Sequence, residues 1–307
     1  MSNVCRICLE DTASGDAYHE RCLRELTGSA VVPQVDLETA RLHTAALAMV
    51  GHTSLSGVQK KISVGFARKN RETLYVMASG GHYILKPQTD VFPFVPENEH
   101  VTTLLAKLAG IEIAPNGLVS LKDGKQAYLV RRFDRLVDGR KRYQEDFCQL
   151  AEQAPKDKYE GSIELCVRLL RRFTDEPLIE IIKLYRLVLF AWWSGNGDMH
   201  LKNLSVTRDE GGIVKLTPAY DLLCTRLLMP DDVFALTIGG KKDKLRRKDW
   251  LELAKYCTLP ERVAESILRA QAEALEKSLE LIERSFLPPD QKEAYKELVV
   301  KRSDAIQ

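Results

Sequence analysis

The feature of this sequence that most constrains the fold is an apolar segment that ends abruptly in a polar loop. Residues 187–193 are all aliphatic or aromatic, so we expect them inside a folded domain. Residues 194–203 follow directly, and in them Asp198 and Asn203 are five positions apart with His200 between them. An Asp and an Asn at this spacing are typical of phosphoryl-transfer sites, where the Asp orients a hydroxyl and the Asn holds Mg²⁺. Because a loop Asp beside a glycine is more often a simple turn former, the pattern alone is weak.

Other residues that such a site needs occur in the matching order along the chain. Lys86 ends a strand-like stretch and could reach nucleotide phosphates as a fixed positive charge, although a surface lysine is the simpler alternative. Glu99 lies in the first turn of the next expected helix and could pair with Lys86, and Glu97 competes for that role. Asp221 follows an expected hairpin, where a second carboxylate ligand for Mg²⁺ is needed. Together these weak signals indicate a site for a phosphate and a metal.

The expected elements predict an α+β, bilobal, protein-kinase-like fold with a small β-rich N-lobe and a larger helical C-lobe. The N-lobe would occupy residues 31–135, with helices at 36–50 and from Pro96 to Gly110, and strands at 61–67, 73–77, 83–86, 119–121 and 127–133. The C-lobe would occupy residues 136–307, with helices at 163–173, 178–193, 248–256 and 258–286 and a hairpin of 204–207 with 213–217. Thr258 and Glu261 have the spacing of a capping box at the start of the last helix.

Composition restricts the class of protein only broadly. The chain has 307 residues with 29% charged and 45% hydrophobic residues, which is typical of a globular protein. Its net charge of +2 gives no argument for nucleic acid or membrane binding. No apolar run approaches the length of about 18 residues that a membrane span needs, and no signal peptide is visible at the start. The odd count of seven cysteines favours reduced thiols in a cytosol-like compartment.

Residues 1–30 contain a separate group of potential metal ligands. Cys5 and Cys8 form one C-x-x-C arm, and His19 and Cys22 form an H-x-x-C arm ten residues further on. These are the ligand types of a Cys₃His zinc site, and four protein ligands would make such a zinc ion structural. The alternative is a reduced, partly buried terminus with scattered thiols. We therefore expect a small zinc-binding segment over residues 1–30.

Once these residues are taken together, the chain resembles the HipA family of bacterial serine/threonine kinases, the toxins of toxin–antitoxin modules. The similarity runs from about Ser54 to the C-terminus. Its motifs are Ser56–Lys61, Tyr83–Lys86, Asn98-Glu99, Leu105–Lys107, Val130–Arg135, Gln144–Gln149, Lys158–Glu160, Gly197–Asn203 and Leu216–Asp221.

The resemblance implies ATP- and Mg-dependent phosphorylation of a protein on serine or threonine. The implied roles are the catalytic base for Asp198, Mg²⁺ ligands for Asn203 and Asp221, and the ATP lysine for Lys86. From its place between Asp198 and Asn203, His200 is expected to be a packing or loop-bracing residue of the cofactor site. Residues 130–133, with Arg132 and Phe133, would form the hinge that holds adenine. The loop at 51–61 replaces a G-x-G-x-x-G motif and would cradle phosphates. Its Ser54, and with it Ser56, would be the autophosphorylation site that switches the kinase off, since a phosphoserine there would repel the phosphates of ATP.

The chain departs from full-length HipA because only about 50 residues precede the phosphate loop. It is therefore similar to the short HipT form, in which a small HipS-like protein supplies the missing subdomain and a HipB-like antitoxin binds DNA. The resemblance implies a protein substrate such as an aminoacyl-tRNA synthetase, a cytoplasmic bacterial location with delivery to a host cell left open, and no membrane partner. Two rival functions remain: a lipid or small-molecule phosphotransferase, and a pseudokinase that acts as a binding module.

Overall fold

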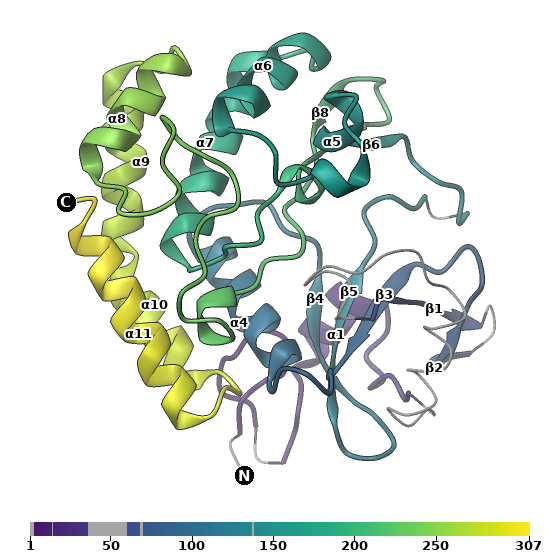
Figure 1. Ribbon diagram of the computed structural model, residues 1–307. Helices are drawn as coiled ribbons and strands as arrows, with labels where there is room; N and C mark the ends of the chain where they lie inside the picture. Colours follow the sequence, from purple (N-terminus) through teal and green to yellow (C-terminus); the bar gives the residue numbers. More distant parts are fainter. Residues whose placement is uncertain (1–2, 14, 36–59, 68–69, 137) are drawn as a thin grey trace. The chain divides into compact units, whose positions relative to one another are not determined.

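The computed structural model describes residues 3–13, 15–35, 60–67, 70–136 and 138–307 (Figure 1). The expected helix at 36–50 and the two serines of the phosphate loop, Ser54 and Ser56, lie outside these residues. The chain divides into two compact units. The first comprises Met1–Leu104, Ala114–Lys141 and Glu283–Pro288, and the second comprises Leu105–Ile113, Arg142–Ile282 and Pro289–Gln307. The predicted α+β fold, with a β-rich first part and a helical second part, is confirmed.

The first unit is built on a five-stranded antiparallel sheet with the order β2-β1-β3-β5-β4. The strands are β1 (Ile62–Ala67), β2 (Asn70–Val76), β3 (Tyr83–Pro87), β4 (Asn116–Ser120) and β5 (Gln126–Arg131). Each lies within a few residues of a strand expected from the sequence. The turn between β4 and β5 uses Gly124 with a φ of +80°, a conformation that glycine adopts without steric cost.

The N-terminal segment shares its core with this sheet. Helix α1 (Glu20–Thr27) buries Cys22, Leu23 and Leu26 on one side, and these side chains join strand residues in one hydrophobic cluster. The loop before α1 also approaches β4 closely, because a Cβ on Gly117 would lie 2.6 Å from Cγ1 of Ile7. Residues 3–27 are therefore packed as part of the first unit.

Helix α4 (Val95–Leu108) begins in the first unit and ends in the second. Pro96 stands in its first turn, where a missing N–H has no cost. At the other end Gly110 has a φ of +74°, and the N–H groups of Gly110 and Ile111 donate to the carbonyls of Lys107 and Ala106 at 3.0 Å each. This is the Schellman arrangement that commonly ends a helix.

The second unit is mainly helical. Its helices are α5 (Phe147–Leu150), α6 (Ile163–Phe173), α7 (Pro177–Trp193), α8 (Arg247–Tyr256), α9 (Glu261–Glu273), α10 (Leu275–Arg284), which crosses into the first unit, and α11 (Pro289–Asp304). Helix α7 is buried almost throughout its second half, as the apolar segment predicted. Within the described parts of the chain, no helix is long and apolar enough to cross a membrane.

Two sequence predictions for the C-terminal helices were wrong. The single helix expected at 258–286 is two helices, α9 and α10, and the capping box at Thr258 is not formed. Thr258 instead has a φ of +58° and ends α8, because its N–H donates to Lys255 and that of Leu259 donates to Ala254, both at 3.0 Å. The residue therefore serves the end of one helix and cannot cap the next, which begins after Pro260.

A small antiparallel sheet interrupts the helices of the second unit. It consists of β6 (Gln144–Asp146), β7 (Ser205–Arg208) and β8 (Val214–Leu216), in that order. The hairpin between β7 and β8 turns at Asp209, whose carboxylate accepts from the N–H groups of Gly211 and Ile213. Strand β7 follows the Asp198–Asn203 loop directly, so this sheet fixes one end of that loop.

Candidate functional site

The loop that carries Asp198 is anchored at the C-terminal end of α7. Gly195 has a φ of +81°, and a Cβ at this position would lie 2.8 Å from Sγ of Cys224, so the backbone turns in a space that only glycine fits. Beyond this turn the Asp198 N–H donates to Oδ1 of Asn196 at 3.0 Å, and the Asp198 carbonyl accepts from the side chain of Asn203 at 2.7 Å. The last bond closes the loop and orients Asn203 toward Asp198.

The carboxylate of Asp198 is held by an aromatic hydroxyl. The hydroxyl of Tyr159 donates to Oδ1 of Asp198 at 2.5 Å. His200 is buried, stacks edge-on against Tyr159 with ring centroids 5.0 Å apart, and has Nε2 at 3.8 Å from the same carboxylate oxygen. These contacts fit a bracing role for His200, since both rings restrict the orientation of the Asp198 side chain.

The surroundings of Asp198 are acidic and partly shielded from water. Burial raises the pKa of Asp198, and the carboxylates of Asp221 and Asp232 raise it further, while the Tyr159 hydroxyl and Lys158 lower it. The net direction is upward. Several carboxylates close together in a desolvated site repel one another, and a bound divalent cation is the usual way to relieve that repulsion.

Asp221 is tied to the same loop by the residue before it. The hydroxyl of Tyr220 donates to the carbonyl of Lys202 at 2.9 Å and lies 2.5 Å from Oγ of Ser205. Asp221 itself has a φ of +55°, which is uncommon for a residue other than glycine, although aspartate adopts it more readily than most residues, and such conformations cluster at functional sites. The second unit thus brings Asp221 beside the Asp198–Asn203 loop.

The donor atoms of this group fit a magnesium ion. Asn203 is buried, and because its Nδ2 donates to Asp198, its Oδ1 is the atom left to act as a ligand. Asp221 adds a carboxylate, and Mg²⁺ is commonly bound by one or two carboxylates together with the phosphates of a nucleotide. Asn203 and Asp221 would therefore be the residues that hold the ion.

In the first unit, Lys86 and Glu99 form a buried ion pair. The ammonium of Lys86 donates to Oε1 of Glu99, and the two side chains are 3% and 2% exposed. Lys86 also lies over the ring of Tyr128, with Nζ 5.5 Å from the centroid. Burial raises the pKa of the competing Glu97, and its Oε2 has no hydrogen-bond partner among the described residues. Of the two carboxylates weighed from the sequence, Glu99 is the partner.

The expected adenine hinge, residues 130–133, begins in the last two residues of β5, and its Arg132 is already engaged. Arg132 donates to both carboxylate oxygens of Asp134, at 2.8 and 2.7 Å, and Arg135 donates to the same group at 2.6 Å. Although burial pushes the pKa of Asp134 upward, these two arginines hold it below its ordinary value. Phe133 is half-buried. Arg132 is therefore set to brace the chain after β5 through Asp134.

Sequence reasoning missed several residues that support the site. Tyr159 and Tyr220 were noted only as parts of motifs, without a role. Asp232 was not predicted. Its Oδ2 lies only 2.0 Å from the position that a Cβ on Gly197 would take, and the same oxygen accepts from the hydroxyl of Thr225. The spacing of Tyr220 directly before Asp221 was a usable signal, whereas nothing local in the sequence links Asp232 to Gly197.

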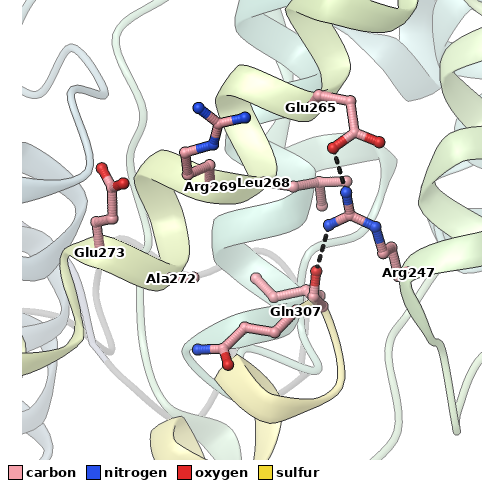
Figure 2. Close-up of a pocket in the computed structure, with 8 residues that line it drawn as sticks. Arg247, Glu265, Leu268, Arg269, Ala272, Glu273 and Gln307 are labelled. Carbon is pink, nitrogen blue, oxygen red and sulfur yellow. Dashed lines mark hydrogen bonds and ion pairs between the residues drawn. The ribbon is translucent and has the colours of Figure 1, made fainter.

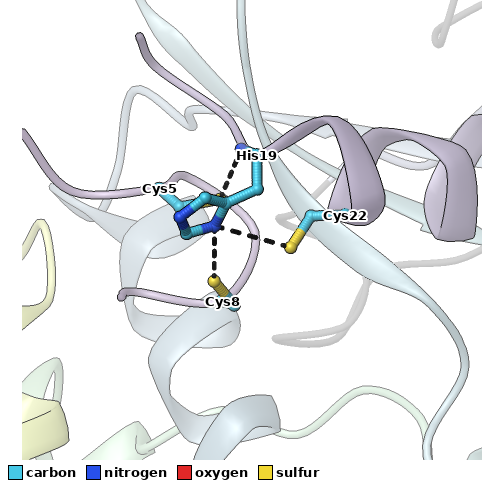
Figure 3. A group of neighbouring side chains, drawn as sticks. All are labelled: Cys5, Cys8, His19 and Cys22. Atoms are coloured by element: carbon cyan, nitrogen blue, oxygen red, sulfur yellow. Dashed lines mark hydrogen bonds between the residues drawn. The ribbon is translucent and has the colours of Figure 1, made fainter. Parts of the chain in front are cut away.

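Two further features do not include these residues. Cys5, Cys8, His19 and Cys22 meet in the first unit, as the spacing of the two arms predicted, and all their ligand atoms lie within 4.8 Å of one another (Figure 3). In the second unit, a hollow of about 390 Å³ is lined by α8, α9 and the chain end, with Arg247 paired to Glu265 (Figure 2). None of the residues predicted for the phosphate and metal site lines this hollow.

The fold is similar to those of solved kinase-like proteins. HipA, in the structure of the Shewanella oneidensis toxin–antitoxin complex of HipA, HipB and operator DNA, matches with a TM-score of 0.70 and 20% identity over 95% of this chain and 79% of HipA. The Helicobacter pylori proinflammatory kinase CtkA matches with a TM-score of 0.51 and 16% identity over 73% of this chain and 87% of CtkA. The class of protein defined by this architecture is therefore the kinase-like fold.

The chain belongs to the family of the HipA-like C-terminal domain, whose model matches residues 53–279. It is 34% identical over 244 residues, or 74% of this chain, to the protein of Sinorhizobium fredii named "Putative kinase Y4mE", and spans 57% of that protein's length. It is 28% identical over 239 residues to a "Putative kinase" of Haemophilus influenzae, covering 72% of this chain and 68% of that protein. The resemblance to the HipA family inferred from the motifs is confirmed.

Proposed function

We propose that the protein is an ATP- and Mg-dependent serine/threonine protein kinase of the HipA/HipT type. The observation that carries the proposal is the tethering in the second unit, where one set of hydrogen bonds gathers Asp198, Asn203 and Asp221 around a desolvated, acidic point. Membership of a family with relatives named as kinases supports the same conclusion.

In the proposed mechanism, Asp198 accepts or orients the proton of the substrate hydroxyl. The raised pKa of Asp198 makes its carboxylate a better proton acceptor than an exposed aspartate, and the Tyr159 hydroxyl keeps one carboxylate oxygen in a fixed direction. When bound through Asn203 and Asp221, Mg²⁺ would neutralise charge on the nucleotide phosphates. In the first unit Lys86, held by Glu99, would serve as the ATP lysine that membership of the family implies.

Similarity to the family extends this proposal to the substrate and the partners. The acceptor would be a serine or threonine of a protein, and an aminoacyl-tRNA synthetase is the candidate that the resemblance supplies. The HipA of Shewanella oneidensis was solved with HipB and operator DNA, which supports a HipB-like antitoxin here, with a small HipS-like protein as a second partner. Autophosphorylation on Ser54 or Ser56 would be the regulatory modification.

The two rival functions predict different results. A lipid or small-molecule phosphotransferase would share the same carboxylates and differ only in its acceptor. A pseudokinase would bind nucleotide without transfer, but the presence of both the Lys86–Glu99 pair and the Asp198, Asn203 and Asp221 group favours an enzyme.

Incubation of the purified chain with labelled ATP, Mg²⁺ and a dephosphorylated bacterial lysate tests the proposal. We expect protein bands to acquire label with the wild type and none to do so with Asp198→Asn. Asp304→Asn, which changes an exposed aspartate at the end of α11, is the matched control and should label like the wild type. Labelled lipid or metabolite without labelled protein would favour the first rival, and nucleotide binding without transfer would favour the second.

A further inference from the structure

The thiols and the imidazole of the N-terminal segment converge on one point. The four candidate ligand atoms lie within 4.8 Å of one another (Figure 3). Zinc bonds of about 2.3 Å to sulfur and about 2.0 Å to nitrogen place neighbouring ligand atoms of a tetrahedral site roughly 3.5–3.8 Å apart. Nδ1 of His19 lies 3.3 Å from Sγ of Cys8 and 3.8 Å from Sγ of Cys22, so a zinc ion fits with only small adjustments.

The orientation of the histidine ring is the one that a metal ligand requires. Nε2 of His19 lies 2.9 Å from the carbonyl oxygen of Asp11. A carbonyl can only accept, so Nε2 carries the proton and Nδ1 presents its lone pair to the thiols. Fixing a ligand histidine through its other nitrogen is the usual arrangement around metals in proteins. The backbone N–H of His19 also donates to Sγ of Cys5 at 3.4 Å, which supports a thiolate there.

The backbone on both sides of the site is already in place. Residues 5–9 form a tight turn, in which the N–H of Leu9 donates to the carbonyl of Cys5 at 2.9 Å and Leu9 adopts a φ of +60°. His19 stands at the N-cap of α1, and Cys22 follows three residues later, so that both project from the same side of its first turn. A strained turn persists only when surrounding contacts hold its backbone in place. Ligation of Cys5 and Cys8 to one metal ion would supply such contacts.

The chemistry of the donor set selects the ion. Three sulfurs and one imidazole suit Zn²⁺, whereas Mg²⁺ prefers oxygen ligands. A single disulfide would bond only two of the three thiols, and it would not explain why the third thiol also lies beside His19. With four protein ligands the site would be closed, so its role would be structural.

The turn between Cys5 and Cys8 also holds the helix that carries Glu99. Ile7, inside the turn, accepts at its carbonyl from Nε2 of His100 at 3.1 Å, and His100 is buried in α4 directly after Glu99. Arg6, its neighbour, accepts at its carbonyl from the N–H of Leu118 in β4 at 2.8 Å. The turn is thus bonded both to α4 and to the sheet.

We propose that Cys5, Cys8, His19 and Cys22 bind one structural zinc ion, and that this ion fixes the turn from which Ile7 holds α4 through His100. The inference goes beyond the proposed kinase function and does not depend on it. Its consequence is that the metal sets the position of the helix that bears Glu99, the partner of Lys86.

Metal analysis of the full chain, expressed with zinc and purified without chelators, tests the first half. We expect one zinc per chain in the wild type and in Cys148→Ser, which changes a buried thiol of the second unit, and a large loss of zinc in Cys8→Ser and Cys22→Ser. Because those two variants could fail to fold, cobalt is loaded into the wild type as a second measurement. The visible absorption bands of tetrahedral cobalt–thiolate ligation support the site. Absence of zinc and of these bands, or a mass lower by two hydrogens from a disulfide, overturns it.

Hydrogen exchange with and without the metal tests the second half. After removal of zinc from the wild type, we expect exchange in residues 95–104 to accelerate by about tenfold, as for the loss of one buried hydrogen bond, with α7 unchanged. His100→Gln should give a similar acceleration while retaining one zinc per chain. Equal exchange in residues 95–104 of the zinc-bound and zinc-free proteins overturns the link to α4 even where zinc is bound.

Discussion

Removal of one partner from the Lys86–Glu99 pair gives the sharpest test of the first unit. In Glu99→Gln, the ammonium of Lys86 stays in a position where its side chain is only 3% exposed and loses its counter-charge. Breaking a buried pair in this way costs about 3–5 kcal/mol. The ring of Tyr128, with Nζ 5.5 Å from its centroid, retains part of that energy, at most about 2 kcal/mol. With the full compensation from Tyr128, we therefore expect a loss of about 1–3 kcal/mol.

At about 2–4 °C per kcal/mol, this loss should lower the melting temperature by about 2–12 °C. The assay must report on the correct unit. All three tryptophans, Trp192, Trp193 and Trp250, belong to the second unit, so their fluorescence is a poor probe of β3 and α4. Calorimetry, combined with hydrogen exchange of residues 83–87 and 95–104, gives the relevant measurement.

A double-mutant cycle separates the pair from its surroundings. Lys86→Met and Glu99→Gln should each be destabilising, and the double variant should be no worse than either single variant because no buried charge is left unpaired. Glu252→Gln is the control, since its pair with Lys255 is 71% and 73% exposed and its loss should leave the midpoint unchanged. Single-variant losses below about 1 kcal/mol that add in the double variant would refute the reasoning.

Three further outcomes follow from the second unit. In Tyr159→Phe, loss of a hydrogen bond that lowers the pKa of Asp198 should shift the acidic limb of the pH–rate profile to higher pH, and an unmoved limb would contradict the assignment of Asp198 as the base. Gly197→Ala should destabilise the protein by more than about 1 kcal/mol, because the new Cβ would lie 2.0 Å from a carboxylate oxygen, whereas Gly211→Ala on the exposed hairpin should unfold at nearly the wild-type urea concentration. Tyr220→Phe should weaken Mg²⁺ binding, read as a higher Mg²⁺ concentration at half-maximal rate with the folded state retained; an unchanged value would argue against the tether described above.

Predictions from the sequence were most accurate where the signals for an element lie close together in one short segment. Helix α6 begins and ends at the expected residues because a Ser162 cap precedes a regular apolar face. The Asp198 loop was predicted from the spacing of Asp198, His200 and Asn203 after an apolar segment, and from the order of other candidate site residues along the chain. The sequence could not choose between Glu97 and Glu99, because both lie in the first turns of one helix.

The misses depend on contacts that no local pattern records. Helix α11 was not predicted, because its buried residues Tyr295, Val299 and Ser303 form a narrow stripe among charged neighbours. Thr258 was assigned to the start of the next helix, but its N–H forms one of the hydrogen bonds that end α8. The support that Asp232 gives to Gly197 arises from residues 35 positions apart in a packed loop. Tertiary contacts of this kind override local propensity.

The path of the chain through α4 limits how the protein can be divided into parts. The boundary between the two compact units passes through the middle of this helix, after Leu104, and the chain then returns to the first unit at Ala114 and again at Glu283. No single cut separates the units into two continuous pieces. Recombination or limited proteolysis would therefore not yield two halves that each survive alone, and we expect the two units to be inherited together.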